Sequence, residues 1–564
     1  MIFKSILPTV DIPGLDLPRF LLAEAKRYIS SPDTVAYYDI GTKESVTFQC
    51  LEDTSHQVAS GLANRFGIKH GQVVAIFSSN HVNYAAVLLG ILSAGAACCT
   101  LSSTLRESEL AYQMADSGAA AIFIDVAHTP VICRALEQGE LKISAECVVV
   151  IDSNYSDSLF TPLSRVLLSQ PYQPLHISSM QESARTLAVI MYSSGTTGLP
   201  KGVMLSHRNL IGQFVAQQAA IEYSGIQLEG VSSTLEPSAS KAHRSLAVLP
   251  FAHIYGLTSL VTNSIASGKS QFILNKYSVD GLLAAIQDHR LESALVVPSI
   301  IRQIAKHNSL DKYNLSSLRV IGSGSSHLPG SLHASATKAL PVHVGSGYGM
   351  SETCSAVTLM GKRNFVPGSV GFLHPGIEAK VVDPQSKQYL SYGQEGELCV
   401  RGDMIMLGYL NRAEETLSAI DSDGFLHTGD IGFISYSNHV FITDRLKELI
   451  KYKGLQVPPA ELEGILAEHP LVVDAGVIGV EDKERGTEVP KAYVTLRDSG
   501  MSGSKARRQQ IAKELAKWVA GRVAPHKQLR GGVEIVDTIT RNQSGKILRG
   551  ELRSRHLAQR ASKL

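Results

Sequence analysis

The chain of 564 residues is too long for a single hydrophobic core, so at least two domains are expected. Its composition, with 44% hydrophobic and 18% charged residues, excludes a disordered or collagen-like protein. The 53 Lys plus Arg against 51 Asp plus Glu give a net charge of +2, which provides no field that attracts nucleic acid or a membrane surface, so small molecules are the expected partners.

The cysteines and the N-terminus argue against secretion. Seven cysteines are scattered along the chain without a CxxC pair or a metal-ligand spacing, so we expect reduced structural thiols in a non-secretory compartment. Residues 1–14 hold one Lys and a short apolar run that Pro8 and Pro13 interrupt, which is a poor secretory signal.

Residues 45–445 alternate helical periods with short apolar segments, a pattern typical of α/β layers with largely parallel sheets. The clearest strands are predicted at 73–77, 121–124 and 246–249. The apolar stretch 84–101 is broken by Gly90 and Gly95, so we expect a buried helix followed by a strand, and no transmembrane segment.

Polar and small residues mark the expected loops. Pro298–Ser299 and Gly322–Ser326 stand where strands end, so ligand-facing loops are expected after the carboxyl ends of strands. Residues 224–244 are polar and poorly periodic, which predicts a surface loop, with a functional lid as the alternative.

After Asp444 the pattern changes to a compact run of strand, helix and strand, which predicts a small α+β domain. A helix is expected around 461–468, and another over 504–523 with an apolar face opposite a solvated basic face. That apolar face is formed by Ile511, Leu515, Trp518 and Val519. The predicted domains are 1–444 and 445–564.

A phosphate-binding loop is predicted at 192–202, after a strand at 186–191. Gly195 and Gly198 let backbone N–H groups approach an anion, and Lys201 adds a positive charge. Hydroxyl donors are supplied by Ser193, Ser194, Thr196 and Thr197. The loop is not a Walker A motif, because no Gly-Lys-Ser/Thr follows at the required spacing.

With this loop, the chain resembles the adenylate-forming superfamily of acyl-CoA synthetases, beetle luciferases and peptide-synthetase adenylation domains. Further matching segments, between about residues 20 and 555, are 250–256, 347–353, 424–430, 444–451 and 544–549. The amino-acid sequences of segments 253–255 and 447–454 are most similar to those of the 4-coumarate:CoA ligase branch. The resemblance implies an α/β fold, with a large N-terminal domain of layered subdomains and a small mobile C-terminal α+β domain.

The resemblance also implies roles at the nucleotide. Tyr348 would offer a flat face to adenine, and Asp430 would accept hydrogen bonds from the ribose hydroxyls. Glu352, together with Thr196, would bind Mg²⁺. The implied ATP/AMP-binding residues are Ser193, Ser194, Gly195, Thr196, Thr197, Gly198, Lys201, Gly347, Tyr348, Ser351, Asp430, Arg445, Lys451, Gln456 and Lys546.

For the reaction, the resemblance assigns Lys546 as the catalytic lysine that bridges the acid carboxylate and the α-phosphate. The small domain would then rotate about a hinge at Lys447 and bring Lys453 and Gly454 to coenzyme A. His253 would flank the acyl carbonyl as a gate, as a base for the thiol or as a core histidine, and these alternatives stay open.

The acyl pocket implied by the plant ligases is a mixed polar and apolar slot that does not choose between a cinnamate-like acid and a fatty or oxylipin acid. Its residues are Tyr255, Ser259, Pro298, Ser325, Ser346 and Gly347. The chain departs from the family pattern at Ser351, where Thr is commoner, and at Thr540–Arg541, where Pro-Lys is usual. Ala252 replaces a bulky aromatic residue and would widen the pocket.

The expected activity is an ATP-dependent carboxylic acid:CoA ligase that uses ATP, Mg²⁺ and coenzyme A. The alternatives are a luciferase-like oxygenase, an enzyme that acylates a carrier protein, and a non-catalytic adenylate-binding protein. The last three residues, Ser562, Lys563 and Leu564, match the tripeptide read by the peroxisomal import receptor. A peroxisomal matrix enzyme of a eukaryote is therefore expected.

Overall fold

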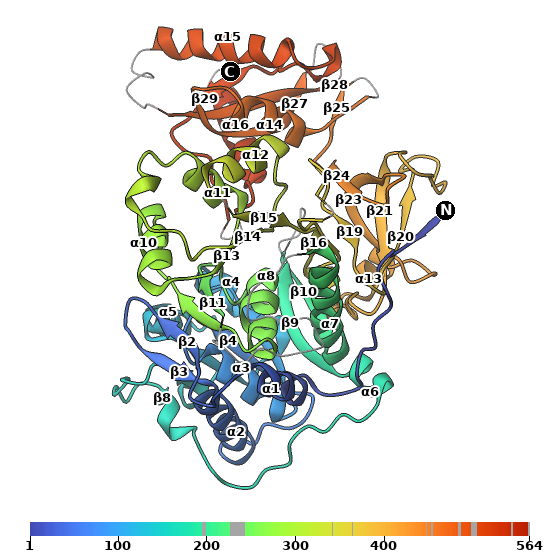
Figure 1. The fold of residues 1–564 in the computed structure, drawn as a ribbon. Helices are drawn as coiled ribbons and strands as arrows, with labels where there is room; N and C mark the ends of the chain where they lie inside the picture. The colour runs from blue at the N-terminus through green and yellow to red at the C-terminus, as the bar shows by residue number, and fades with distance from the viewer. Residues whose placement is uncertain are drawn as a thin grey trace.

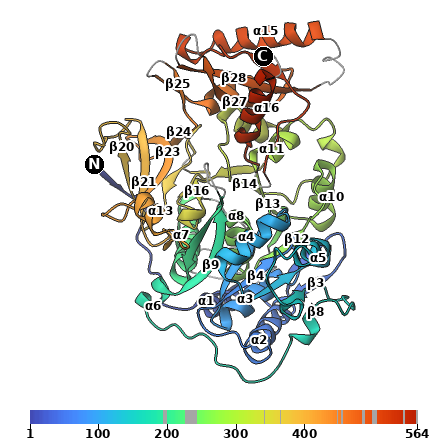
Figure 2. The ribbon, with the colours of Figure 1, turned by 180° about the vertical axis from the view of Figure 1, so that it is seen from behind.

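The structure is a computed structural model in which a small domain lies on top of a larger body (Figure 1, Figure 2). It describes residues 1–193, 199–225, 243–340, 342–363, 365–446, 448–452, 455–482, 487–497, 505–542 and 545–561. Two mostly parallel sheets form the centre of the large body, as the alternating pattern predicts.

The first of these sheets has eight strands. Their order is β22 (Gly408–Tyr409), β10 (Lys201–Ser206), β9 (Leu187–Ser193), β5 (Ala97–Leu101), β4 (Val73–Phe77), β6 (Ala121–Ile124), β7 (Val148–Val150) and β8 (Thr161–Pro162). The strands predicted at 73–77 and 121–124 are confirmed as β4 and β6. The predicted buried helix and strand are α3 (Tyr84–Ser93), every residue of which is buried, and β5.

The second sheet has seven strands. Their order is β15 (His343–Ser346), β14 (Val320–Ser323), β13 (Ser293–Val296), β11 (Arg244–Ala247), β12 (Ser270–Ile273), β2 (Val35–Asp39) and β3 (Ser45–Thr47). Strand β11 ends at Ala247, two residues before the end of the strand predicted at 246–249. Pro250 follows shortly after, and it has no backbone N–H to donate to a neighbouring strand. The predicted loop at 224–244 lies largely outside the described residues.

Helices cover both faces of these sheets (Figure 1, Figure 2). They include α1 (Leu17–Tyr28), α2 (Phe48–Asn64), α7 (His207–Ser224), α10 (Val279–His289), α11 (Pro298–Ala305) and α12 (Gly330–Ala339). Helix α7 begins at a capping box, in which the Ser206 side chain accepts from the Asn209 N–H at 3.1 Å and Asn209 accepts from the Ser206 N–H at 2.8 Å. Within the described residues, no helix combines the length and apolarity that crossing a bilayer requires.

A third sheet corrects the expectation of largely parallel sheets up to residue 445. Its strands, all antiparallel, are β1 (Ile2–Lys4), β20 (Glu378–Val382), β21 (Gly396–Arg401), β23 (Leu426–Ile434) and β24 (Val440–Arg445). Two parallel strands need a long connection, usually a helix, that returns the chain to the other end of the sheet. From β20 onward no long helix follows each strand, so neighbouring strands pair antiparallel.

The small domain has a hydrophobic core of its own, separate from that of the large body. Its elements are the hairpin β25 (Ile450–Tyr452) and β26 (Leu455–Val457), the sheet β27 (Val472–Asp482), β28 (Thr487–Leu496) and β29 (Val533–Ile535), and helices α14 (Pro459–Ala467), α15 (Lys505–Ala520) and α16 (Arg549–Ala561). Ile511, Leu515 and Val519 of α15 are buried in that core, as the periodicity predicts. The boundary at 444/445 stays a prediction, and the cysteines are all free, as expected.

Candidate active site

A cavity of about 1280 Å³ lies between the strand ends of the large body and the small domain. The predicted site residues that line it are Ser193, Lys201, His253, Tyr255, Ser259, Pro298, Ser325, Ser346, Gly347, Tyr348, Ser351, Glu352, Asp430, Arg445 and Lys546. Residues from several strands and helices thus meet beside the carboxyl ends of the parallel strands, where loops of α/β folds hold ligands.

Asp430 is the centre of the nucleotide end of this cavity. It is 3% exposed, and its Oδ2 accepts a hydrogen bond from the Tyr348 hydroxyl at 2.7 Å. Its Oδ1 lies 3.0 Å from Nε of Arg445, which is its direct cross-strand partner between β23 and β24. A carboxylate fixed in this way still has free lone pairs that can accept hydrogen bonds from two vicinal hydroxyls of a ligand. The Tyr348 ring lies beside it and can stack on a flat ring of the same ligand.

Glu352 marks the phosphate end. Its Oε1 accepts hydrogen bonds from the Ser193 hydroxyl at 3.3 Å and from the Tyr409 hydroxyl at 3.0 Å. The ammonium of Lys201 lies over the Tyr409 ring, 5.1 Å from its centroid. The structure therefore brings a nearly buried carboxylate and a lysine to the mouth of the predicted phosphate loop.

Lys546 enters the cavity from the small domain. Its loop bends at Gly545, whose φ is +78° and where a Cβ atom would lie 3.2 Å from the Cβ of Val297 in the large body. The backbone N–H of Lys546 donates to Asn542 at 2.9 Å. Burial, and then the charge of Arg445, lower the pKa of Lys546, which means that both disfavour its charged form. An anion bound in the cavity would stabilise this ammonium.

His253 lines the same cavity and is half-buried. Its Nδ1 accepts a hydrogen bond from the Tyr255 N–H at 3.4 Å. Burial, together with the nearby Lys546 charge, lowers the pKa of His253 to about 4. The imidazole is therefore neutral at physiological pH, which is compatible with all three alternatives, the gate, the base and the core histidine.

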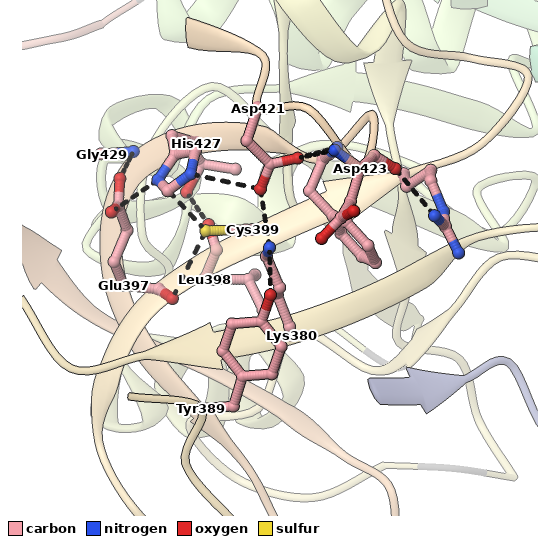
Figure 3. Close-up of polar contacts among 12 residues, drawn as sticks. Lys380, Tyr389, Glu397, Leu398, Cys399, Asp421, Asp423, His427 and Gly429 are labelled. Carbon is pink, nitrogen blue, oxygen red and sulfur yellow. Dashed lines mark hydrogen bonds and ion pairs between the residues drawn. The ribbon is translucent and has the colours of Figure 1, made fainter. Parts of the chain in front are cut away.

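The irregular part of β23 that precedes Asp430 is supported by a hydrogen-bond network that the sequence analysis did not predict (Figure 3). The buried carboxylate of Glu397 accepts from the Gly429 N–H at 3.1 Å and lies 3.0 Å from Nδ1 of His427. Because the His427 side chain and the Gly429 N–H contact the same carboxylate, Glu397 fixes the backbone of β23 immediately before Asp430. His427 stands in the predicted 424–430 segment, but its partners do not.

His427 is also bound on its other side. Its Nε2 lies 3.5 Å from Asp421, which in turn contacts the Lys380 ammonium at 2.6 Å (Figure 3). The hydrogen bond to Glu397 raises the pKa of His427, which favours the imidazolium between the two carboxylates.

Donor atoms of Glu397, Cys399 and His427 all lie within 4.8 Å of one another, a spacing that a metal ion could use. Burial raises the pKa of the Cys399 thiol, however, and a metal ligand must be a thiolate. The charges of the cluster are already paired by His427 and by Lys380. We therefore interpret this cluster as a support for Asp430 and not as a metal centre.

A latch of three charged residues joins the two domains beside Lys546. Asp474 of β27 accepts hydrogen bonds from Arg541 at 3.0 and 2.7 Å and from Arg302 of α11 at 3.3 Å. Arg541 also donates to the carbonyl of Gly545 at 2.7 Å. The latch thus links the large body to the loop that presents Lys546. Sequence analysis missed Asp474 because no motif contains it.

Some predicted site residues are not brought to the cavity or cannot be placed. Lys451 is exposed on β25, where its N–H donates to Glu488 at 2.9 Å, and it does not line the cavity. This corrects its predicted place near the adenylate, because the small domain presents its 541–549 segment to the cavity and not β25. Ser194, Gly195, Thr196, Thr197, Gly198, Lys447, Lys453, Gly454, the side chain of Gln456, and Ser562, Lys563 and Leu564 lie outside the described residues.

Comparisons with known proteins agree with this geometry. Residues 26–410 match the family described as "AMP-binding enzyme", and residues 461–546 match the "AMP-binding enzyme C-terminal domain". The chain is 34% identical to 4-coumarate-CoA ligase 1 of Narcissus pseudonarcissus over 99% of this chain and 97% of the relative. It is also 34% identical to luciferin 4-monooxygenase of Photinus pyralis, over 93% and 91% of the two chains.

Among solved structures, ATP-bound MatB from Rhodopseudomonas palustris has the same fold. It superposes with a TM-score of 0.80 at 26% identity, over 96% of this chain and 99% of that chain.

Replacing Asp474 with Asn should loosen the latch. A hydrogen bond to a charged group contributes about 1.5–3 kcal/mol, so amide hydrogens of α11 and of the 541–549 segment should exchange about 10- to 100-fold faster. Hydrogen–deuterium exchange by mass spectrometry checks this. The matched control is Asp311→Asn, at an exposed aspartate of the large body, and equal exchange in the two variants would contradict the role of the latch.

Proposed function

This chain belongs to the family of AMP-binding enzymes, and from that premise we propose how its cavity turns a carboxylic acid into an acyl-CoA. The chain is an acid–thiol ligase that forms an adenylate, like the 4-coumarate–CoA ligases to which it is similar. The observation that carries the proposal is the meeting of Lys546 with the Asp430, Tyr348 and Arg445 cluster in one cavity.

In the first step, a carboxylate oxygen of the acid attacks the α-phosphorus of ATP, and pyrophosphate leaves with the electron pair of the broken P–O bond. The protein aligns the two substrates and neutralises charge on the phosphate oxygens. Asp430 with Arg445 holds the ribose, and the Lys546 ammonium lies between the carboxylate and the α-phosphate.

Glu352 is the residue of this cavity that fits Mg²⁺. It is 7% exposed, and Ser193 and Tyr409 both donate to its Oε1, which fixes a hard oxygen donor on the wall of the cavity. When bound, Mg²⁺ supplies positive charge to the leaving pyrophosphate. Thr196, the second predicted ligand, lies outside the described residues.

In the second step, the sulfur of coenzyme A attacks the acyl carbonyl, AMP leaves as its phosphate takes up the electron pair of the acyl–oxygen bond, and the thiol proton must be removed. A neutral His253 that lines the cavity supports its role as acceptor of that proton. We keep Lys453 and Gly454 as the proposed coenzyme A contacts and Lys447 as the proposed hinge.

For the acid, an aromatic acid and a fatty or oxylipin acid are both compatible with Tyr255 and Ser259. A panel of these acids, incubated with ATP and Mg²⁺ with and without coenzyme A, tests the activity through release of AMP and pyrophosphate. We expect acid-dependent AMP formation that coenzyme A accelerates. Turnover indifferent to coenzyme A would favour a luciferase-like oxygenase or carrier-protein acylation, and adenylate binding without turnover would favour a non-catalytic protein.

Lys546→Ala should separate the two steps. Loss of one charged donor at the phosphoryl group predicts a fall of at least about 100-fold in adenylation from free acid. Thioester formation from supplied acyl-adenylate should change much less, because the lysine acts before the adenylate exists. Lys513→Ala, at an exposed lysine of α15, is the control. Equal loss of both half-reactions would refute the assignment.

We also propose residence in the peroxisomal matrix, supported by the C-terminal Ser562, Lys563 and Leu564. A fluorescent protein fused to the N-terminus should colocalise with a peroxisomal marker in eukaryotic cells. Deletion of the three residues should disperse it. A punctate distribution that survives the deletion would contradict import through this tripeptide.

A further inference from the structure

The cavity extends well beyond the nucleotide, along the seven-stranded sheet. Ser323 and Ser346 line it at the carboxyl ends of β14 and β15, and Ser245 and Ser293 line it at the amino-terminal ends of β11 and β13. Four residues of a strand span about 10 Å, so the two ends are separated by the length of a medium-chain acyl group.

The opposite wall of the cavity, formed by the helical segment 254–266, is of similar length to the strands. Tyr255, Ser259 and Asn263 follow one another at intervals of four residues along the helical segment 254–266, which places them in one line, and all three line the cavity. Eight residues of α-helix rise by about 12 Å, and the π-helical part Leu257–Thr262 makes this segment somewhat shorter. The acyl chain therefore has a path from the nucleotide end to Asn263.

The path passes between Tyr255 and β14 at Gly322. A Cβ atom there would lie 2.5 Å from Leu295 and 3.4 Å from the Tyr255 hydroxyl. Any larger residue would therefore fill this passage or displace its neighbours. Glycine at this position leaves the inner end of the cavity accessible from the acyl side of the site.

The inner end is polar and not apolar. Gln271, Ser245 and Ser293 are register partners on the adjacent strands β12, β11 and β13, and all three line the cavity. Lys269, two residues before Gln271, lines it as well, since residues two apart point to the same side of an extended segment. A pocket for a simple hydrocarbon end would instead carry apolar side chains along this row.

Two groups in this inner end lack partners within the described part of the chain. Gln271 is 1% exposed, its Nε2 donates to Ser264 at 2.8 Å, and its Oε1 accepts no hydrogen bond. The Lys269 ammonium makes no hydrogen bond or ion pair with the described residues. Burial lowers the pKa of Lys269 to about 8, so it stays mostly protonated at neutral pH.

The other polar groups nearby are already satisfied. Glu292, the nearest carboxylate in sequence to Ser293, is bound by His243 at 2.7 Å, and Ser293 contacts the same imidazole at 2.9 Å. Asn263 donates to Gln217 at 2.8 Å. Lys269 is half-buried, and an unpaired ammonium at such a place is costly, so an anion there would relieve the cost.

We propose that Lys269 and Gln271 form a subsite for a second carboxyl group at the far end of the acid, so that this ligase activates medium-chain α,ω-dicarboxylic acids. The proposal rests on the proposed function and names its substrate class. The near carboxylate reacts at Lys546, and the distal carboxylate forms a charge-assisted hydrogen bond with Lys269. Because the free Gln271 Oε1 is an acceptor and a carboxylate has no donor, a bound water bridges the two groups.

The test compares decanedioic, decanoic and ω-hydroxydecanoic acids, through kcat/KM for acid-dependent AMP release. In the wild type the dicarboxylic acid should be preferred, and Lys269→Met should lower its kcat/KM relative to decanoic acid by about 10- to 100-fold. Lys269→Arg, which keeps the charge, should retain the preference. The control is Lys276→Met, at an exposed lysine after the other end of β12.

Turnover in which decanoic or ω-hydroxydecanoic acid is preferred, or in which Lys269→Met leaves the ratio unchanged, overturns the subsite while the ligase activity stands. Absence of turnover with every acid of both panels would count against the proposed function instead. In that case, calorimetric binding of decanedioate still decides the subsite. The wild type should bind it about 10- to 100-fold more tightly than Lys269→Met does, and equal affinities would overturn the proposal.

Discussion

The insertion of one ammonium group into a cavity that already holds a guanidinium is the constraint on which the rest of this structure depends. Burial, and then the proximity of the Arg445 charge, lower the pKa of Lys546. Asp430, Glu448 and Glu352 oppose the repulsion. Asp474, which accepts hydrogen bonds from Arg302 and Arg541, also holds the loop of the small domain in place.

The cavity that this closure completes changes character along its length. At one end Asp430, Tyr348 and Arg445 supply fixed hydrogen-bonding groups for a nucleotide. In the middle the walls narrow around Tyr255 and Gly322. At the other end Lys269 restores positive charge. Two cationic regions separated by an apolar passage match a molecule that carries a negative charge at each end.

Local patterns in the sequence were sufficient to predict much of the fold and several residues of the candidate site. Strands β4 and β6 follow from their apolar runs, and the lysine, the aspartate and the phosphate loop stand in motifs that carry their chemistry within a few residues. The antiparallel direction of β20 to β24 was missed because short strands look alike locally whichever way they pair. Asp474 was missed since its partners lie 172 and 67 residues away, and Lys269 because it precedes a strand and belongs to no motif.

The pairing of Asp430 with Arg445 on neighbouring strands has one more consequence. Arg445 is the last residue of β24, and the chain leaves the large body directly after it. Any rotation of the small domain about the following residues therefore leaves this pair, and a nucleotide held by it, in place. In the proposed rotation, the acyl-adenylate made in the first step would stay anchored while the catalytic loop withdraws. The same site would then serve both proposed reactions without releasing the intermediate to water.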